Sequence, residues 1–189
     1  LLLVGLGNPG SNYTNTRHNI GFKIIDAINA HFKLSKQKPK FKGLLTTGNI
    51  DEKKIYAIKP LTFMNNSGTA IKELIDYFKI DAKDVFVFHD DMDIDFGKIK
   101  TKFGGSSAGH NGIESIDKFI GKDYSRVRIG IGHPKRKKKV NNHVLEDFKE
   151  DEEEKINDIT DNIVKQLPTL IEKKIDLFSS KVNQDLNGI

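Results

Sequence analysis

Apolar residues occur along the chain in two patterns, short continuous runs and positions three or four residues apart. The runs predict buried β-strands, and the wider spacing predicts helices that pack one face against a sheet. The predicted strands are residues 1–4, 44–47, 55–58, 85–88, 97–103 and 126–132, and the predicted helices are residues 17–32, 67–78, 113–120, 156–167 and 170–178. Because strands alternate with helices, we expect one α/β domain over residues 1–189.

Local signals refine this pattern. The strands at 44–47 and 55–58 flank a turn-like segment, which predicts a hairpin and therefore a mixed sheet surrounded by helices. Ser67 is the predicted N-cap of the second helix, and Pro168 is expected to break or kink the long helix near the C-terminus. Residues 35–42 are basic and show no apolar pattern, which predicts a surface connection.

Polar side chains follow several of the predicted strands. Asn8 and His18 come after the first strand, Asn65 after the hairpin, and Asp90 directly after the apolar run at 85–88. In open α/β sheets, ligands bind where the strands end. We therefore expect His18 and Asp90 to meet at one edge of the sheet.

His18 and Asp90 are candidates for a general base and for the carboxylate that orients it. A neutral imidazole can take a proton from water near pH 7, and a hydrogen-bonded carboxylate fixes its tautomer and stabilises the imidazolium that forms. Asn8, Asn65 and Asn111 suit a substrate carbonyl, because an amide NH₂ donates to a developing oxyanion without adding charge beside the base. Each asparagine taken alone also fits a simple turn former.

Two sequence patterns point to other chemistry. Residues 5–10 match the dinucleotide-binding pattern G-x-G-x-x-G, but Pro9 lacks an N–H group and no helix is predicted to begin at once. Residues 105–109 match G-x-S-x-G, which would make Ser107 the nucleophile of a serine esterase. The predicted strand before Ser107 contains several lysines, whereas such a nucleophile normally follows a buried central strand. The Ser107 esterase stays open as an alternative.

A metal site would draw on His89, Asp90, Asp91 and Asp93. These side chains could bind a divalent ion, but the sequence contains no H-x-x-x-H pair and no other ligand cluster that supports one. A metal is therefore not expected.

Composition narrows the class of protein. The 189 residues include no cysteine, which excludes disulfides and thiolate catalysis and suits a cytoplasmic protein. No apolar run approaches the roughly 20 residues of a membrane-crossing helix, and residues 1–4 lack the basic flank of a signal peptide. The net charge is +5, and basic residues crowd between Lys98 and Lys139. This distribution favours a polyanionic partner, although an ordinary solvated surface would look the same.

Six motifs occur together in the order and spacing seen in one family. They are GLGNPG at 5–10 with Tyr13, TRHN at 16–19, PLTFMNNSG at 60–68, HDDMD at 89–93, GHNG at 109–112 and RIGIGHP at 128–134. With these motifs the chain resembles the bacterial-type peptidyl-tRNA hydrolases from residue 2 to about residue 145. It departs from the family at Asp91-Met92, where Glu-Leu is usual.

The resemblance implies hydrolysis of the ester between a peptide and the terminal ribose of tRNA, which recycles tRNA from prematurely terminated translation. It implies a mixed twisted sheet surrounded by helices, and a monomer that needs neither metal nor cofactor. By the family's motifs, His18 is the catalytic base and Asp90 is its orienting carboxylate.

The resemblance also implies where the substrate binds. The residues that match substrate-binding positions of the family are Asn8, Tyr13, Phe63, Met64, Asn65, His110 and Asn111. Lys100, Lys102 and Arg128 match a basic surface for tRNA phosphates, which supply affinity without sequence readout. From charge alone, residues 135–139 could extend that surface. A non-catalytic tRNA-binding module is the remaining alternative.

Overall fold

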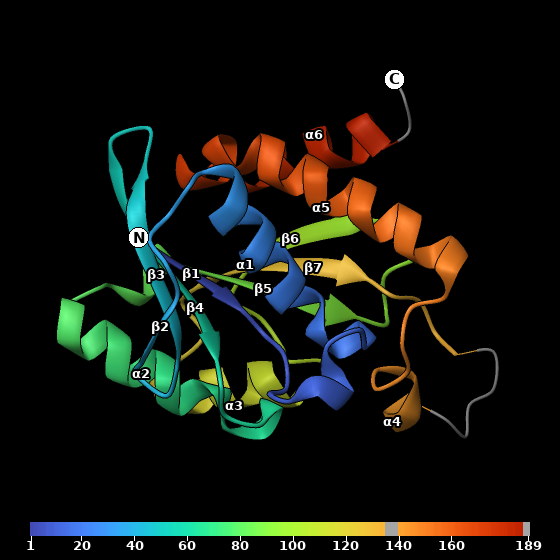
Figure 1. Cartoon of the computed structure of the whole chain (residues 1–189), viewed down its shortest axis with the longest axis horizontal. Helices are drawn as coiled ribbons and strands as arrows, with labels where there is room; N and C mark the ends of the chain where they lie inside the picture. The colour runs from blue at the N-terminus through green and yellow to red at the C-terminus, as the bar shows by residue number, and fades with distance from the viewer. Residues whose placement is uncertain (135–139, 187–189) are drawn as a thin grey trace.

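The computed structural model describes residues 1–134 and 140–186, and a seven-stranded sheet runs through its centre (Figure 1). The strands are β1 (Leu2–Gly5), β2 (Lys38–Lys40), β3 (Gly43–Ile50), β4 (Lys53–Pro60), β5 (Val85–Asp91), β6 (Ile99–Phe103) and β7 (Ser125–Gly130), in the spatial order β2-β3-β4-β1-β5-β7-β6. The central strands β4, β1, β5 and β7 are parallel, and the pairs β2–β3, β3–β4 and β6–β7 are antiparallel. The predicted mixed sheet is confirmed.

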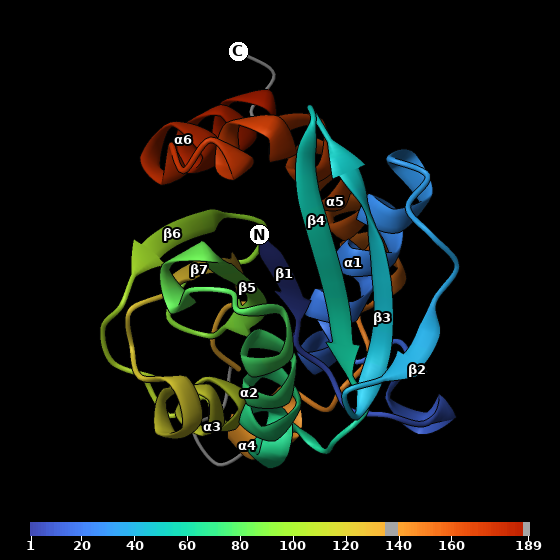
Figure 2. The ribbon, with the colours of Figure 1, turned by 90° about the vertical axis from the view of Figure 1, so that its left-hand side faces the viewer.

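Helices cover both faces of this sheet (Figures 1 and 2). Helices α1 (Ile20–His31), α5 (Glu150–Ile171) and α6 (Ile175–Leu186) pack on one face, and α2 (Ser67–Phe78) and α3 (Asn111–Ile120) pack on the other. Because successive side chains of a strand point to opposite faces, Leu3 and Phe86 join the first layer while Leu2 and Val85 join the second. No helix in the described ranges combines the length and the apolar character that crossing a membrane requires.

Short helical turns connect the sheet to its helices. They are η1 (Ser11–Tyr13), η2 (Arg17–Asn19), η3 (Met64–Asn66), η4 (Ala82–Asp84) and the four-residue helix α4 (Val140–His143). The predicted hairpin is confirmed, and it closes with Asp51 and Glu52 at φ 46° and 64°, the two positive values that a tight type I′ turn requires.

Helix α1 approaches the sheet so closely that two positions admit only glycine. A Cβ atom at Gly21 would lie 2.3 Å from the Leu6 nitrogen, and one at Gly5 would lie 2.2 Å from the Gly21 carbonyl oxygen. Real Cβ atoms do not approach backbone atoms this closely, so any side chain would push the helix outward. The close approach holds the start of α1, and η2 immediately before it, against the ends of β1 and β5.

The segment predicted as an unstructured connection, residues 35–42, contains strand β2. Lys38 pairs with Leu45 of β3 in antiparallel register, and all three residues of β2 are exposed. An exposed edge strand has no apolar alternation to reveal it. Its two lysines and Pro39 are residue types that discourage pairing with another chain.

The predicted N-cap of the second helix is wrong. Ser67 is the first residue of α2 rather than its N-cap, because η3 runs directly into the helix and Ser67 Oγ donates to the Met64 carbonyl (2.9 Å). Pro168 lies inside α5 and does not break it, since the helix continues to Ile171. Leu170 and Ile171 of this last turn are buried, so packing against the core outweighs the local effect of proline.

Candidate active site

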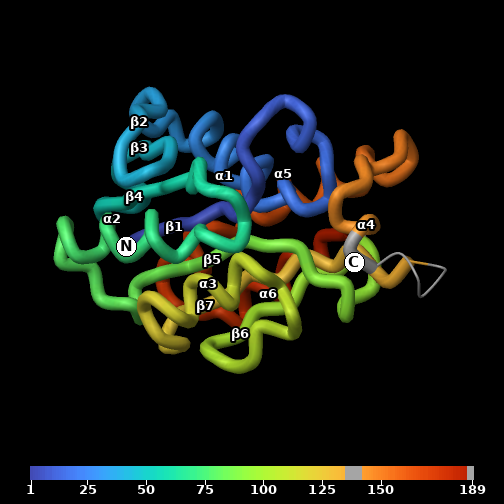
Figure 3. The backbone as a smooth tube through the Cα atoms, turned by 90° about the horizontal axis from the view of Figure 1, so that it is seen from below, coloured from blue at the N-terminus to red at the C-terminus, as the bar shows by residue number. Residues whose placement is uncertain are grey.

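His18 lies in η2, which is fastened to the segment that leads into α5. The backbone N–H of His18 donates to the Val144 carbonyl (2.8 Å), and that of Arg17 donates to the Glu146 carbonyl (3.0 Å). The buried guanidinium of Arg17 adds bonds to the Asp147 carbonyl and to Glu152 Oε2, each 2.6 Å long. Figure 3 shows these distant segments side by side at the end of the sheet where β1 and β5 finish.

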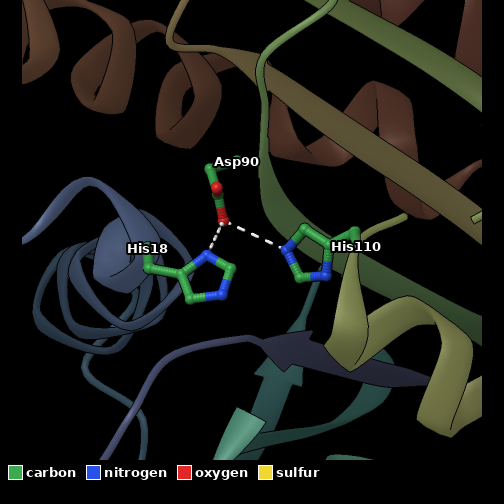
Figure 4. A group of neighbouring side chains, drawn as sticks. All are labelled: His18, Asp90 and His110. Carbon is green, nitrogen blue, oxygen red and sulfur yellow. Dashed lines mark hydrogen bonds and ion pairs between the residues drawn. The ribbon is translucent and has the colours of Figure 1, made fainter. Parts of the chain in front are cut away.

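His18, Asp90 and His110 form one hydrogen-bonded group (Figure 4). His18 Nδ1 lies 2.8 Å from Asp90 Oδ1, and His110 Nε2 lies 3.1 Å from the same oxygen. Since an ionised carboxylate only accepts hydrogen bonds, both imidazoles donate to it. The Nδ1–H of His18 is therefore committed to Asp90, and its Nε2 is left as the nitrogen that can accept a proton.

Charge sets the protonation of this pair. Burial alone would lower the pKa of His18, but the negative charge of Asp90 and the hydrogen bond to it outweigh burial and raise that pKa. Burial likewise opposes ionisation of Asp90, but the charge of His18 and the hydrogen bonds that His18 and His110 donate outweigh it, so the pKa of Asp90 falls well below its usual range. The arrangement is an ionised carboxylate beside a strengthened base.

Among the described residues, His18, Asp90 and His110 also form the only cluster with the ligand types and spacing of a metal site. His110 does not fit that role. Its Nδ1 accepts the backbone N–H groups of Gly112 (3.1 Å) and Ile113 (3.3 Å), so the ring hydrogen is on Nε2, the nitrogen that faces Asp90. A metal at Nε2 would require the hydrogen to move to Nδ1, against two N–H donors.

The set considered from the sequence, residues 89–93, does not converge on one point. His89 donates from Nδ1 to the Asp90 carbonyl (2.7 Å), and burial holds the pKa of His89 well below its ordinary value. Asp91 Oδ2 accepts from Arg128 Nε (2.7 Å), and Asp93 Oδ1 lies 2.9 Å from His133 Nε2.

The predicted amide residues gather in a cavity of about 330 Å³ beside His18. Asn8, Asn65 and Asn111 line it together with His18, Phe63, Met64, Val144 and Leu145. The Asn8 side chain accepts the Met64 N–H at Oδ1 (2.9 Å), which directs its amide nitrogen elsewhere, and that nitrogen bonds no protein atom in the described part of the chain. Asn19, to which the sequence pattern assigned no role, fixes the Asn8 backbone with two bonds, of 2.8 and 2.9 Å.

A second cavity, of about 210 Å³, shares His18, Asn111 and Val144 with the first. Asp90, Asp91, Ser107, His110 and Asn111 are among the residues that line it. Ser107 follows β6, an edge strand rather than a buried central one, and within residues 1–134 and 140–186 its hydroxyl bonds no histidine. The geometry of a serine nucleophile is therefore missing from this loop.

The remaining predicted positions lie apart from the base. Tyr13 is in η1 and lines neither of these two cavities. Lys100 and Lys102 are exposed on β6, with Lys100 opposite Arg128 of β7. Arg128 lies near them as predicted, but its Nε already donates to Asp91, a bond that the sequence does not reveal. The basic run at 135–139 is outside the described residues.

The dinucleotide pattern at residues 5–10 has no matching structure. The 3₁₀ turns η1 and η2 follow Gly10, and α1 begins only at Ile20. No helix N-terminus is thus available to hold a pyrophosphate at this turn.

Comparison with known proteins places these observations in a family. The family model described as "Peptidyl-tRNA hydrolase" matches residues 2–188. A peptidyl-tRNA hydrolase of Pelagibacter ubique is 72% identical over 183 residues, which are 97% of this chain and 98% of the relative, and one of Ehrlichia ruminantium is 46% identical over 181 residues, 96% of this chain and 93% of the relative. The crystal structure of peptidyl-tRNA hydrolase from Acinetobacter baumannii superimposes with a TM-score of 0.90 at 34% identity, covering 96% of this chain and 93% of that one.

Proposed function

The chain belongs to the peptidyl-tRNA hydrolase family and hydrolyses peptidyl-tRNA, and we propose that it does so with His18 as general base and Asp90 as the carboxylate that orients it. The observation that carries this proposal is the buried 2.8 Å bond between His18 Nδ1 and Asp90 Oδ1. It commits one imidazole nitrogen to the carboxylate and leaves the other to act on water.

Each atom of the reaction has a place in this scheme. His18 Nε2 takes a proton from a water molecule as the water oxygen bonds to the ester carbonyl carbon. Asp90 stabilises the imidazolium that results. When the tetrahedral intermediate collapses, the bond from the carbonyl carbon to the ribose oxygen breaks, and His18 returns its proton to that oxygen. The products are a tRNA with a free terminal hydroxyl and the carboxylic acid of the peptide, which keeps the second hydrogen of the attacking water until it loses it to solvent as a proton.

The amide residues suit the stabilisation of charge in this reaction. Asn8 has its carbonyl oxygen occupied by Met64, so its NH₂ group is the part available to a substrate carbonyl. Asn65 and Asn111 share the cavity with Asn8 and His18, and Asn65 is proposed to lie nearest the oxyanion. Phe63, whose side chain is exposed at the edge of this cavity, and Met64 offer apolar surface to the substrate. Tyr13 is proposed to contact the substrate from η1.

Lys100, Lys102 and Arg128 are proposed to bind the phosphates of the tRNA. They lie on adjacent strands at the β6 edge of the sheet, and Arg128 reaches Asp91 at the wall of the smaller cavity. Lysine and arginine contacts to phosphates are independent of base sequence, which suits an enzyme that acts on many tRNAs.

The assembly and setting are proposed as well. Residues 1–189 would act as one domain and as a monomer in the cytoplasm, where translation takes place. The hydrogen-bonding of His110 argues against a metal in the His18–Asp90–His110 group, so hydrolysis is proposed to need no cofactor.

The decisive measurement is release of peptide from a purified N-blocked aminoacyl-tRNA, with and without EDTA. We expect release in both cases, and none from the variant His18→Ala. A protein that binds tRNA but releases no peptide would be the non-catalytic module, inhibition by EDTA would restore a metal role, and loss of activity in Ser107→Ala would favour the serine esterase.

A further inference from the structure

His110 occupies an unusual position at the start of α3. It is the N-cap residue of this helix, and its Nδ1 accepts hydrogen bonds from the backbone N–H groups of Gly112 and Ile113. These are two of the orphan donors that every helix presents at its N-terminus. The lone pair of His110 Nδ1 is therefore fully used by the helix cap.

This cap decides which tautomer His110 adopts. A nitrogen that accepts two N–H bonds carries no hydrogen, so the hydrogen of the neutral ring is on Nε2. That Nε2–H points at Asp90 Oδ1, 3.1 Å away, the same oxygen that accepts from His18 (Figure 4). Both ring nitrogens are thus engaged by the protein, and neither is left to bind a substrate.

The surroundings of His110 hold it firmly. Arg126 is 2% exposed and donates to the carbonyls of Ser106 (2.7 Å) and Gly105 (3.1 Å) and to Asp117 Oδ1 (3.0 Å), which ties both the loop before His110 and the helix after it to β7. The ring of His89 stands nearly edge-on to the His110 ring, with centroids 4.8 Å apart. Loop, helix and strand together fix the direction of the Nε2–H group.

We propose that His110 is a positioning residue for hydrolysis. Helix α3 holds it in its neutral Nε2–H tautomer, and its Nε2–H donates to Asp90. This hydrogen bond fixes the orientation of the Asp90 carboxylate and the negative charge that it presents to His18. This inference rests on the proposed roles of His18 and Asp90. It assigns His110 a different task from the substrate contact that the family resemblance implies. The hydrogen bond withdraws part of the negative charge at Oδ1, so Asp90 orients the base without holding its proton too strongly.

Two substitutions test separately the cap made by Nδ1 and the hydrogen bond donated by Nε2. Asparagine carries an acceptor near the place of Nδ1 and is a favoured N-cap, so His110→Asn keeps the cap and loses the donor to Asp90. Glutamine carries its NH₂ group near the place of Nε2, so His110→Gln keeps a donor and loses the cap. Their kcat, KM and thermal midpoints are measured beside those of the unchanged enzyme.

We expect His110→Asn to lower kcat by about tenfold or more, the effect of losing one hydrogen bond to a charged group, with KM and the thermal midpoint little changed. His110→Gln should keep more of kcat but unfold at a lower temperature. The reverse ranking of kcat would make His110 only a helix cap, and a raised KM with unchanged kcat would make it a substrate-binding residue. Either result would overturn the proposal.

The pH profile supplies a readout that a structural role would not move. The titratable and charged groups nearest His110 are His18 in η2, His89 and Asp90 on β5, and Arg126 on β7. Asp91 and Asp93 lie along the wall of the same cavity, and Glu114 lies in the first turn of α3. Without the His110 donor, Asp90 presents more negative charge to His18 and favours its protonated form. The acidic limb of kcat/KM should therefore move to higher pH in His110→Asn, and an unmoved limb would contradict the proposal.

Nitrogen NMR of the unchanged protein tests the tautomer directly, because the chemical shifts of an imidazole distinguish the protonated nitrogen from the bare one. We expect hydrogen on Nε2 and a bare Nδ1 for His110 at neutral pH. A protonated Nδ1 would refute the proposal. Failure of the unchanged enzyme to release peptide would instead count against the proposed function, so the two can fail separately.

Discussion

His18 Nδ1 lies 2.8 Å from Asp90 Oδ1, although 72 positions separate the two residues in the chain. The hydrogen bond forms because β1 and β5 are parallel neighbours, so the turns that follow them meet at the same edge of the sheet. Its electrostatic consequence is a raised pKa for His18, which determines the pH range in which the proposed base is neutral.

The pH dependence of the enzyme should report this shift. The proposed mechanism requires neutral His18, so kcat/KM should rise with pH through an ionisation above the ordinary histidine value of 6.5. The stability that this pair contributes changes with pH in the opposite direction to kcat/KM. The contribution of the protonated His18–Asp90 pair is fully present below 6.5 and is lost as pH rises through the raised pKa. Kinetics and urea titrations between pH 5 and 9 measure both, and an ionisation below 6.5 would contradict the geometry.

His18→Ala should reduce kcat by at least about 10²–10⁴-fold, since it removes the group that takes the proton from water. Binding of tRNA should persist, because the basic residues on β6 are untouched. The matched control is His31→Ala, at an exposed histidine at the end of α1, which should hydrolyse normally. Peptide release and filter binding of tRNA measure the two effects, and normal turnover by His18→Ala would exclude it as the base.

Asp90→Asn should slow hydrolysis less than His18→Ala does, because the base is still present but is poorly oriented. Its pH profile should also shift. Without the carboxylate charge, the pKa of His18 is no longer raised, so the acidic limb should move to lower pH, the direction opposite to that expected for His110→Asn. If neither the rate nor the acidic limb of the pH profile changed, Asp90 would have no part in the mechanism.

The double variant Lys100→Ala and Lys102→Ala should weaken tRNA binding and raise KM with little change in kcat. The slope of log affinity against log salt should fall by about 1 for each phosphate that the variant no longer binds. Lys38→Ala with Lys40→Ala is the matched control, because these lysines are exposed on β2 at the opposite edge of the same sheet. Equal effects of the two double variants would mean that only net charge matters.

Arg126→Met should destabilise the fold by about 3–5 kcal/mol, because it leaves the mostly buried Asp117 carboxylate without its ion-pair partner. The exposed pair of Lys72 and Asp76, spaced i,i+4 on α2, gives the control: Lys72→Ala should cost only about 0.3–0.5 kcal/mol. Urea denaturation measures both. Similar losses in the two variants would show that burial of Arg126 adds nothing.

The sequence predicted those features that leave a pattern of burial. Runs such as Val85 to Phe88 mark central strands because both faces of the sheet are covered, and the order of strands and turns then brings His18 toward Asp90. Strand β2 left no such pattern because it is exposed. At Pro168, core packing of the last turn of α5 outweighs the tendency of proline to end a helix.

The details of the site were harder to predict because they depend on which atom of a side chain faces which partner. GHNG at 109–112 marked His110, but only the structure shows its Nδ1 at the helix and its Nε2 at Asp90. The family resemblance grouped Arg128 with Lys100 and Lys102, whereas its bond to Asp91 needed the register of β5 and β7. The bonds from η2 to Val144 and Glu146 involve backbone carbonyls, which carry no sequence signal.

Those last bonds bear on how the enzyme is made. The turn that carries His18 is completed by carbonyls at 144, 146 and 147 and by Glu152, all from a part of the chain synthesised much later. A growing chain on the ribosome can form β1, α1 and β5 before this segment has emerged. The proposed base therefore acquires all of these hydrogen bonds only after residue 152 has left the exit tunnel, so an unfinished copy of the enzyme should fold in part before it can hydrolyse its substrate.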